Sequence, residues 1–137
     1  MTQQRIDWDT YFMNISNQVK ERSPDPSRQV GAVLVSKTNR IISTGYNGIP
    51  SGIPDDIDWS DRDFVHSIVI HAEANAILYA ESKFESSKMY ITTSPCKDCI
   101  KIIAASGVRQ VFYSEEYKDI EKVKTLCLFF DIELIRI

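Results

Sequence analysis

The second half of the chain alternates strand-like apolar segments with helix-like segments, and this alternation constrains the fold more than any other feature. Strands are expected at 89–92, 108–113 and 132–136, and helices are expected after Pro95 and from about residue 120. A helix that connects two strands of one sheet brings the chain back to the edge where it started, so successive strands run parallel. The second half therefore predicts a parallel sheet covered by helices.

The first half predicts a different pairing, because two apolar runs at 30–35 and 41–46 are separated by a short polar turn. Such runs are typical of an antiparallel β-hairpin. Adding this hairpin to the parallel half gives a mixed sheet of five strands. The remaining expected elements are a helix from 8 to before Pro24 with Asp7 or Asp9 as its cap, a helix from 71 to about 83, and a loop from 47 to about 60.

The composition excludes several classes of protein. With 137 residues, 43% of them hydrophobic, the chain has the size and apolar content of one domain, expected to span 1–137. A net charge of −3 gives no basic surface for nucleic acid. No apolar run reaches the roughly 18 residues of a membrane span, and the polar first residues lack a signal peptide's apolar core. We therefore expect a cytoplasmic protein that binds neither membranes nor nucleic acid.

Two of the three cysteines form the motif Cys96-x-x-Cys99, which follows an expected strand and begins the helix that Gly107 should end. At a helix N-terminus, free N–H groups and the helix dipole favour the thiolate over the thiol. A thiolate can ligate a metal ion or attack a disulfide. This motif alone therefore fits both a metal site and a thioredoxin-like redox site.

A second motif, His71-Ala72-Glu73, begins 25 residues before Cys96 (96 − 71 = 25) and favours the metal site. One imidazole and two thiolates give zinc three protein ligands and leave its fourth tetrahedral position open to water, which is the arrangement of a catalytic site. The remaining His and Cys residues are His66 and Cys127. Cys127 falls on the apolar face of the last helix, where an inert core cysteine is expected.

Glu73 supplies the carboxylate that a hydrolytic zinc site needs, because it can take a proton from water and pass it to the leaving group. An acidic residue in a first helical turn can also act only as a partner of the helix dipole. Residues i and i+2 project about 200° apart on a helix. Glu73 and His71 can therefore reach one ion only if His71 lies at the cap with a non-helical backbone.

The combination of H-x-E with P-C-x-x-C is the signature of the zinc deaminases, and three longer motifs narrow this resemblance. Residues 23–32 (SPDPSRQVGA), 45–52 (GYNGIPSG) and 71–77 (HAEANAI) resemble the deoxycytidylate (dCMP) deaminases. The resemblance implies a cytidine-deaminase-like three-layer α/β/α sandwich with a five-stranded mixed sheet. It also implies one catalytic zinc ion per chain and hydrolysis of dCMP to dUMP and ammonia, a source of dUMP for dTMP synthesis.

The same resemblance implies roles for individual residues. His71, Cys96 and Cys99 would hold the zinc ion, and Glu73 would transfer protons. The implied substrate contacts are Asn47 for the deoxyribose, backbone groups of Ala72 and Ser94 for the cytosine edge, Ser23 and Arg28 for the 5′-phosphate, and Tyr113 and Tyr117 as residues that close the pocket. For the two tyrosines, ordinary packing at a strand end is an equal alternative.

Regulation and assembly are also implied by the resemblance alone. It implies a homohexamer, with dCTP as activator and dTTP as inhibitor, and leaves open whether dCTP is also a substrate. The regulatory nucleotide would bind with Mg²⁺ at the loop that contains Gly48, Asp55 and Asp56. The Gly and Asp content of this loop fits such binding and equally fits a plain surface loop.

Several alternatives to a dCMP deaminase stay open at this point. Within the superfamily, the substrate could be tRNA adenosine, a free base or dCTP; the acidic composition disfavours tRNA, and the loop 25–28 disfavours a free base. If the protein were a thioredoxin-like oxidoreductase, His71 and Glu73 would have no function in its mechanism. A catalytically silent nucleotide-binding or sensor protein could carry the same motifs.

Overall fold

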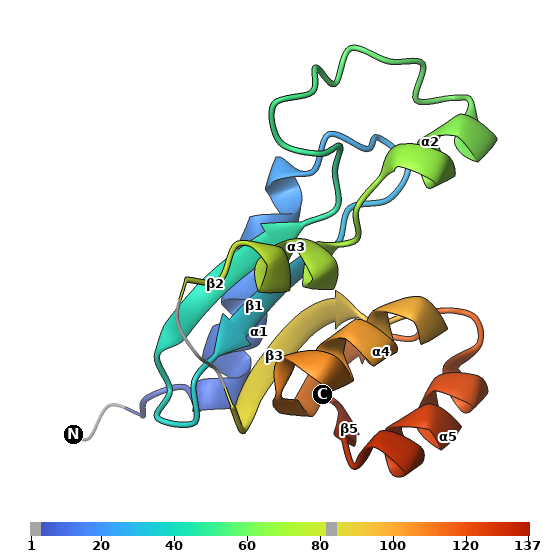
Figure 1. Ribbon diagram of the computed structural model, residues 1–137. Coiled ribbons are helices and arrows are strands. Elements are labelled where there is room, and N and C mark those ends of the chain that lie inside the picture. The colour runs from blue at the N-terminus through green and yellow to red at the C-terminus, as the bar shows by residue number, and fades with distance from the viewer. Residues whose placement is uncertain (1–3, 82–84) are drawn as a thin grey trace.

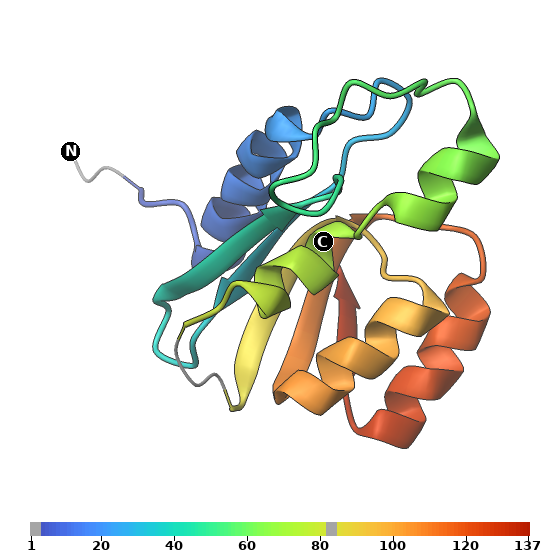
Figure 2. The same ribbon diagram turned by 45° about the horizontal axis from the view of Figure 1, so that its top comes forward.

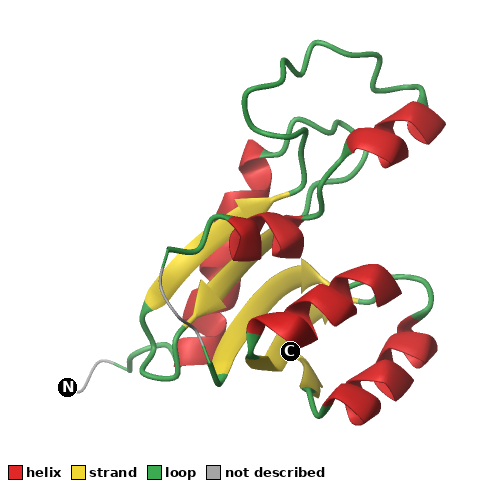
Figure 3. Ribbon diagram, in the orientation of Figure 1, coloured by secondary structure: helices red, strands yellow, loops and turns green. Residues whose placement is uncertain are grey.

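The computed structural model describes residues 4–81 and 85–137, which form a five-stranded sheet with helices on both faces (Figures 1 and 3). None of the helices that it describes has the length and apolar character needed to cross a membrane. The elements in chain order are α1 (Trp8–Val19), a 3₁₀ turn η1 (Lys20–Arg22), β1 (Gly31–Val35), β2 (Ile41–Tyr46), α2 (Arg62–Ile68), α3 (Ala72–Leu78), β3 (Ser87–Thr93), α4 (Lys97–Ser106), β4 (Val108–Glu115), α5 (Ile120–Phe130) and β5 (Glu133–Arg136).

The strands lie in the order β2-β1-β3-β4-β5. β1 pairs antiparallel with both β2 and β3, and Val33 lies opposite Thr44 on one side and Tyr90 on the other. β3–β4 and β4–β5 are parallel pairs. The predicted hairpin, the predicted parallel half and the five-stranded mixed sheet are therefore confirmed.

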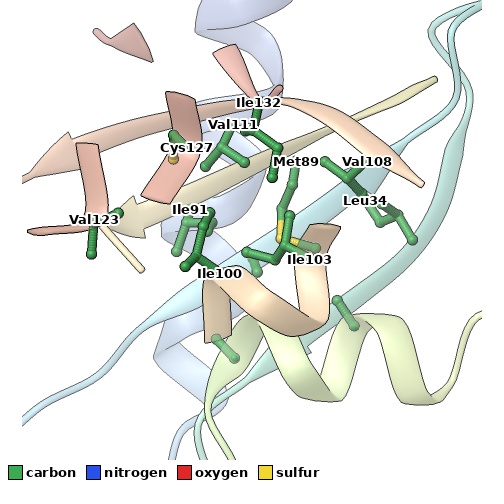
Figure 4. Close-up of a cluster of buried hydrophobic side chains, with 13 residues drawn as sticks. Leu34, Met89, Ile91, Ile100, Ile103, Val108, Val111, Val123, Cys127 and Ile132 are labelled. Carbon is green, nitrogen blue, oxygen red and sulfur yellow. The ribbon is translucent and has the colours of Figure 1, made fainter. Parts of the chain in front are cut away.

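Both faces of the sheet are covered, with α1 on one and α3, α4 and α5 on the other (Figure 2). β1 is therefore buried along its whole length. A strand that is covered on both faces has an uninterrupted apolar sequence, as β1 does. The cluster against α1 consists of Phe12, Met13, Val33, Val35, Tyr90 and Phe112. The cluster on the opposite face (Figure 4) consists of Ala32, Leu34, Ala72, Ala76, Met89, Ile91, Ile100, Ile103, Val108, Val111, Val123, Cys127 and Ile132.

The helix boundaries follow local capping. Asp7 caps α1, because its side chain accepts a hydrogen bond of 2.7 Å from the backbone N–H of Thr10. Gly107 ends α4 in the left-handed conformation (φ 100°), as expected.

The helix expected from 71 to about 83 is shorter than predicted. α3 ends at Leu78, because the N–H of Ala80 donates to the carbonyl of Ile77 and tightens the last turn. The end of the predicted helix, at 82–83, lies outside the described residues.

α2 was not expected from the sequence. Its N-cap is Asp61, whose side chain accepts from the N–H of Phe64, and Val65 is its buried residue. The chain between β2 and α2 is a loop, as expected, and it extends with α2 beyond the end of the sheet (Figures 1 and 3). A backbone bridge between Gly48 and Ile70 closes the base of this excursion directly before α3.

The position of α3 depends on a close backbone approach at Gly45 in β2. A Cβ atom at Gly45 would lie 2.3 Å from the carbonyl oxygen of Ala72 and 2.5 Å from the nitrogen of Ala76. No side chain fits in that space, so only glycine lets α3 lie this close to the sheet. The first turn of α3 is thereby fixed against the end of β2.

We expect Gly45→Ala to lower the free energy of unfolding by about 1–3 kcal/mol, because the added methyl group overpacks the contact between β2 and α3. Gly48→Ala is the matched control, since its nearest neighbour atoms would lie at an ordinary 3.6 Å. Urea unfolding of both variants measures the difference. Equal stability of the two would contradict this account of how α3 is placed.

Candidate active site

The site is built where the N-termini of α3 and α4 meet. His71 is the N-cap of α3 and Cys96 the N-cap of α4, and both have an extended backbone (ψ 157° and 170°). The non-helical cap conformation that His71 needs in order to share a site with Glu73 is therefore present. Cys99 follows in the first turn of α4.

The ligand atoms of His71, Cys96 and Cys99 all lie within 4.8 Å of one another. The His71 Nδ1 atom is 3.2 Å from the Cys99 Sγ atom and 3.6 Å from the Cys96 Sγ atom. Zinc bonds of about 2.3 Å to sulfur and about 2.0–2.1 Å to nitrogen in a tetrahedron place neighbouring ligand atoms roughly 3.5 Å apart. The three side chains therefore fit a tetrahedral zinc ion with one position left for a non-protein ligand.

The thiols of Cys96 and Cys99 have pKa values shifted in opposite directions. The hydrogen bond from Cys99 lowers the pKa of Cys96 to about 4, against the effect of partial burial and with help from His71, so Cys96 is a thiolate at neutral pH. The same interaction, together with burial, raises the pKa of Cys99. A bound divalent cation deprotonates a coordinating thiol. Metal binding at this site must therefore release a proton.

Glu73 lies in the first turn of α3 and is buried, with 4% of its surface exposed. Its Oε1 atom is 3.7 Å from the Nδ1 atom of His71. Burial raises the pKa of Glu73, although hydrogen bonding with Cys99 and the charge of His71 oppose this shift. An acidic residue that only interacted with the helix dipole could remain exposed to solvent, whereas Glu73 is buried beside the ligand group. The position favours a carboxyl group that exchanges protons.

A pocket opens beside the ligand group and contains many of the residues that the sequence suggested. His71, Glu73 and Cys96 are among its lining residues. Five further predicted residues also line it: Arg28, Asn47, Ala72, Ser94 and Tyr117. They come from the loop before β1, the end of β2, the start of α3 and the segments after β3 and β4.

Arg28 and Tyr117 meet at this pocket. The guanidinium carbon of Arg28 lies 4.2 Å from the centre of the Tyr117 ring, a cation–π distance. The Asn47 side chain donates to the carbonyl of Arg28 and accepts from the N–H of Val30, both at 2.8 Å. The N–H of Tyr117 donates to the hydroxyl of Ser94 at 2.7 Å. Arg28 is therefore held both through its backbone and through its side chain.

Ser23 and Tyr113 are not among the residues that line the pocket. The Ser23 hydroxyl donates to the carbonyl of Asn47 at 2.7 Å, so it supports a lining residue. The Tyr113 hydroxyl donates to the Glu116 carboxylate at 3.0 Å.

The three residues suggested for regulation also lie outside the pocket lining. Gly48 forms the backbone bridge with Ile70. Asp55 and Asp56 are exposed in the loop that follows.

Six lining residues were not expected from the sequence: Asp25, Val30, Arg62, His66, Val69 and Thr93. Arg62 and His66 belong to α2, and Val69 directly follows it. Asp61 as a cap, followed by apolar residues at 65, 68 and 69, was a usable signal for this helix.

Comparison with known proteins agrees with the geometry. Residues 6–115 match the family model of the cytidine and deoxycytidylate deaminase zinc-binding region. The chain belongs to this family. The deoxycytidylate deaminases of Mus musculus and Homo sapiens are 37% and 36% identical to it over 135 residues, covering 93% of this chain and 76% of each relative.

The fold comparison gives the same family. The crystal structure of dCMP deaminase from the cyanophage S-TIM5 superimposes with a TM-score of 0.79 at 26% identity, covering 98% of this chain and all of that one. A second crystal structure of that phage enzyme is a complex with dCMP and dUMP. The resemblance stated from the motifs and the fold it implied are thus confirmed. Family membership also decides between the metal site and the thioredoxin-like alternative, in favour of the metal.

We expect about one zinc ion per purified chain, and its loss in Cys96→Ala and Cys99→Ala. Cys127→Ala is the matched control, since Cys127 is a buried core thiol whose pKa burial raises to about 11. Elemental analysis measures the metal content. A metal-free protein with a reversible disulfide between Cys96 and Cys99 would contradict the site.

Zinc retention should also fall on acidification. The interaction with Cys96 raises the pKa of His71 above its ordinary value of 6.5, although burial opposes this shift. Protonated His71 cannot ligate zinc, so affinity falls more steeply as the pH drops through this raised pKa, in addition to the dependence that the proton lost from Cys99 imposes. Dialysis against a chelator at a series of pH values measures the dependence. Retention that rises towards low pH would contradict the assignment of His71 as a ligand.

Proposed function

We propose that this protein catalyses the hydrolytic deamination of dCMP to dUMP and ammonia. The observation that carries the proposal is one pocket that combines two chemically different groups. It is lined by Glu73 beside the His71, Cys96 and Cys99 ligand group, and also by Arg28. The substrate named for the similar phage structure, and the names of the relatives, support the same choice.

His71, Cys96 and Cys99 would hold the zinc ion. Bound there, zinc supplies a water nucleophile at neutral pH, because it lowers the pKa of water from 15.7 to about 7. The three side chains would also fix where the water nucleophile meets the cytosine ring, because all three lie at the N-termini of α3 and α4.

Glu73 carries out the proton transfers. Its buried carboxylate accepts a proton from the attacking water and delivers it to N3 of the cytosine ring. It then takes the remaining proton of the added hydroxyl group and delivers it to the departing amine. One water is consumed and one ammonia released, so the carboxylate returns to its starting state. Burial supports this role because it raises the pKa of Glu73 above its ordinary value, which makes the carboxylate a better proton acceptor.

Arg28 would bind the 5′-phosphate. An arginine can form charge-assisted hydrogen bonds to phosphate oxygens, and Tyr117 and Asn47 hold this one in the pocket. A phosphate contact distinguishes a nucleotide from a nucleoside or a free base. The net charge of −3 supports a mononucleotide over tRNA as the substrate.

We also propose that the enzyme is a single catalytic domain that acts in the cytoplasm as a homohexamer, activated by dCTP with Mg²⁺ and inhibited by dTTP. The resemblance to dCMP deaminases supports this regulation. So does the position of the loop after Gly48, because its backbone bridge to Ile70 joins it to the residue before His71. Rates with dCMP in the presence of dCTP or dTTP, and with dCTP alone, test these points.

Glu73→Gln should lower kcat by at least about 10²–10⁴, because glutamine keeps the size of the side chain and cannot accept the proton. Zinc content and the unfolding midpoint should stay near those of the wild type. Glu121→Gln, at an exposed glutamate of α5, is the matched control. Ammonia release from dCMP is the measurement, and activity within a few-fold of wild type would reassign Glu73 to helix capping.

Arg28→Ala should raise KM for dCMP roughly 10- to 150-fold, since a charge-assisted contact contributes about 1.5–3 kcal/mol. Deoxycytidine, which lacks the phosphate, should be a poor substrate that is nearly indifferent to the substitution. Arg40→Ala, at an exposed arginine in the β1–β2 turn, is the control. Equal efficiency of the wild type on both substrates would show that the pocket does not recognise a phosphate.

A further inference from the structure

A buried acidic residue, Asp25, lines the pocket next to the arginine that would bind the phosphate. Only 3% of its surface is exposed. Its Oδ1 atom accepts hydrogen bonds from the N–H groups of Ser27 at 2.9 Å and Arg28 at 3.4 Å. The carboxylate therefore holds the backbone of the loop that carries Arg28.

Asp25 is paired with Arg62 of α2, which lies 37 residues later in the chain. The two terminal nitrogens of Arg62 donate to both carboxylate oxygens, at 3.1 Å and 2.9 Å. One of these nitrogens also donates to the carbonyl of Trp59 at 3.0 Å. This bidentate geometry fixes the arginine more firmly than a single contact would.

The negative charge of Asp25 is compensated by the guanidinium of Arg62. Burial raises the pKa of Asp25, but the hydrogen bonds from Arg62, Ser27 and Arg28 outweigh it, and the net pKa lies below the ordinary value. Asp25 is thus a carboxylate at neutral pH. An unpaired carboxylate in this pocket would repel a phosphate dianion, whereas a carboxylate paired with a guanidinium presents little net charge.

We propose that Arg62 is a positioning and specificity-determining residue for the 5′-phosphate, which acts by neutralising Asp25 while Asp25 holds the loop of Arg28. This inference rests on the proposed function. It assigns to α2 a part in choosing nucleotides over nucleosides, although Arg62 need not touch the substrate.

Four variants in the full chain test the inference: Arg62→Gln, Asp25→Asn, the double variant Asp25→Asn/Arg62→Gln, and Arg62→Lys. Arg62→Gln leaves the carboxylate unpaired, so KM for dCMP should rise about 10- to 100-fold with kcat little changed. Efficiency on deoxycytidine should stay within about 3-fold of wild type, because that substrate has no phosphate charge for the Asp25 carboxylate to repel.

The double variant supplies the decisive comparison. It removes both charges, and the side-chain oxygen of the introduced asparagine can still accept from the loop N–H groups, so KM for dCMP should return to within about 5-fold of wild type. Asp25→Asn alone removes the repulsive charge, and its KM for dCMP should stay below that of Arg62→Gln. Arg109→Gln is the matched control, because the Arg109 guanidinium donates to the backbone carbonyls of Ala104 and Val108, at the other end of β4.

Three results would overturn the inference. A double variant no better than Arg62→Gln would mean that Arg62 binds the phosphate directly. Equal losses on dCMP and deoxycytidine would mean a general structural role, and a wild-type KM in Arg62→Gln would mean no role. If Arg62→Gln fails to fold, Arg62→Lys decides: it loses the bidentate geometry but keeps the positive charge beside Asp25, so a KM rise above about 10-fold would contradict neutralisation.

Failure of the proposed function is visible separately. A wild-type protein that does not deaminate dCMP, or that prefers deoxycytidine, refutes the function before any variant is measured. A wild type that strongly prefers dCMP, combined with variants that do not follow the expected order, refutes only the role of Arg62.

Discussion

The packing of two helix N-termini against each other is the constraint on which the rest of the site depends. His71 and Cys96 serve as helix caps, and each holds an extended backbone conformation that places a ligand atom ahead of its helix. If His71 were the first fully helical residue, Glu73 would project to the far side of α3. The cap conformation therefore allows a metal ligand and a proton-transfer group to be only two residues apart in sequence.

The sheet supplies the rigidity that these caps need. β3 runs directly into the segment that contains Cys96, and β3 is the central strand, paired on both sides. Gly45 in β2 lets the first turn of α3 lie against the backbone of the sheet. Small displacements of a reacting group cost large factors in rate. Anchoring both caps to paired strands limits such displacements.

Much of this architecture could be predicted from short-range patterns, including α4, the parallel strands and the metal-ligand motifs. The pairing of Asp25 with Arg62 could not, because no local pattern links residues 37 positions apart. Strand ends are also difficult to locate, because pairing with neighbouring strands sets them more than local preference does. The strand expected to end at Tyr113 continues to Glu115. Tyr113 therefore lies inside the strand, whereas Tyr117 follows the strand end and reaches the pocket.

The mixed sheet also has a consequence for how the molecule folds. The zinc ligands lie within residues 71–99, one run of helix, strand and helix, and His71 is 28 positions from Cys99. Arg28, Asp25 and Arg62 come from the first half of the chain. The strands of the two halves join where β1 meets β3, with Val33 opposite Tyr90 and 57 positions separating them in sequence (90 − 33 = 57). Contacts of such long range form late and slow the folding of a domain. Because α3 packs against β2 of the first half, the metal site is completed, like the phosphate contacts, only once the two halves have joined.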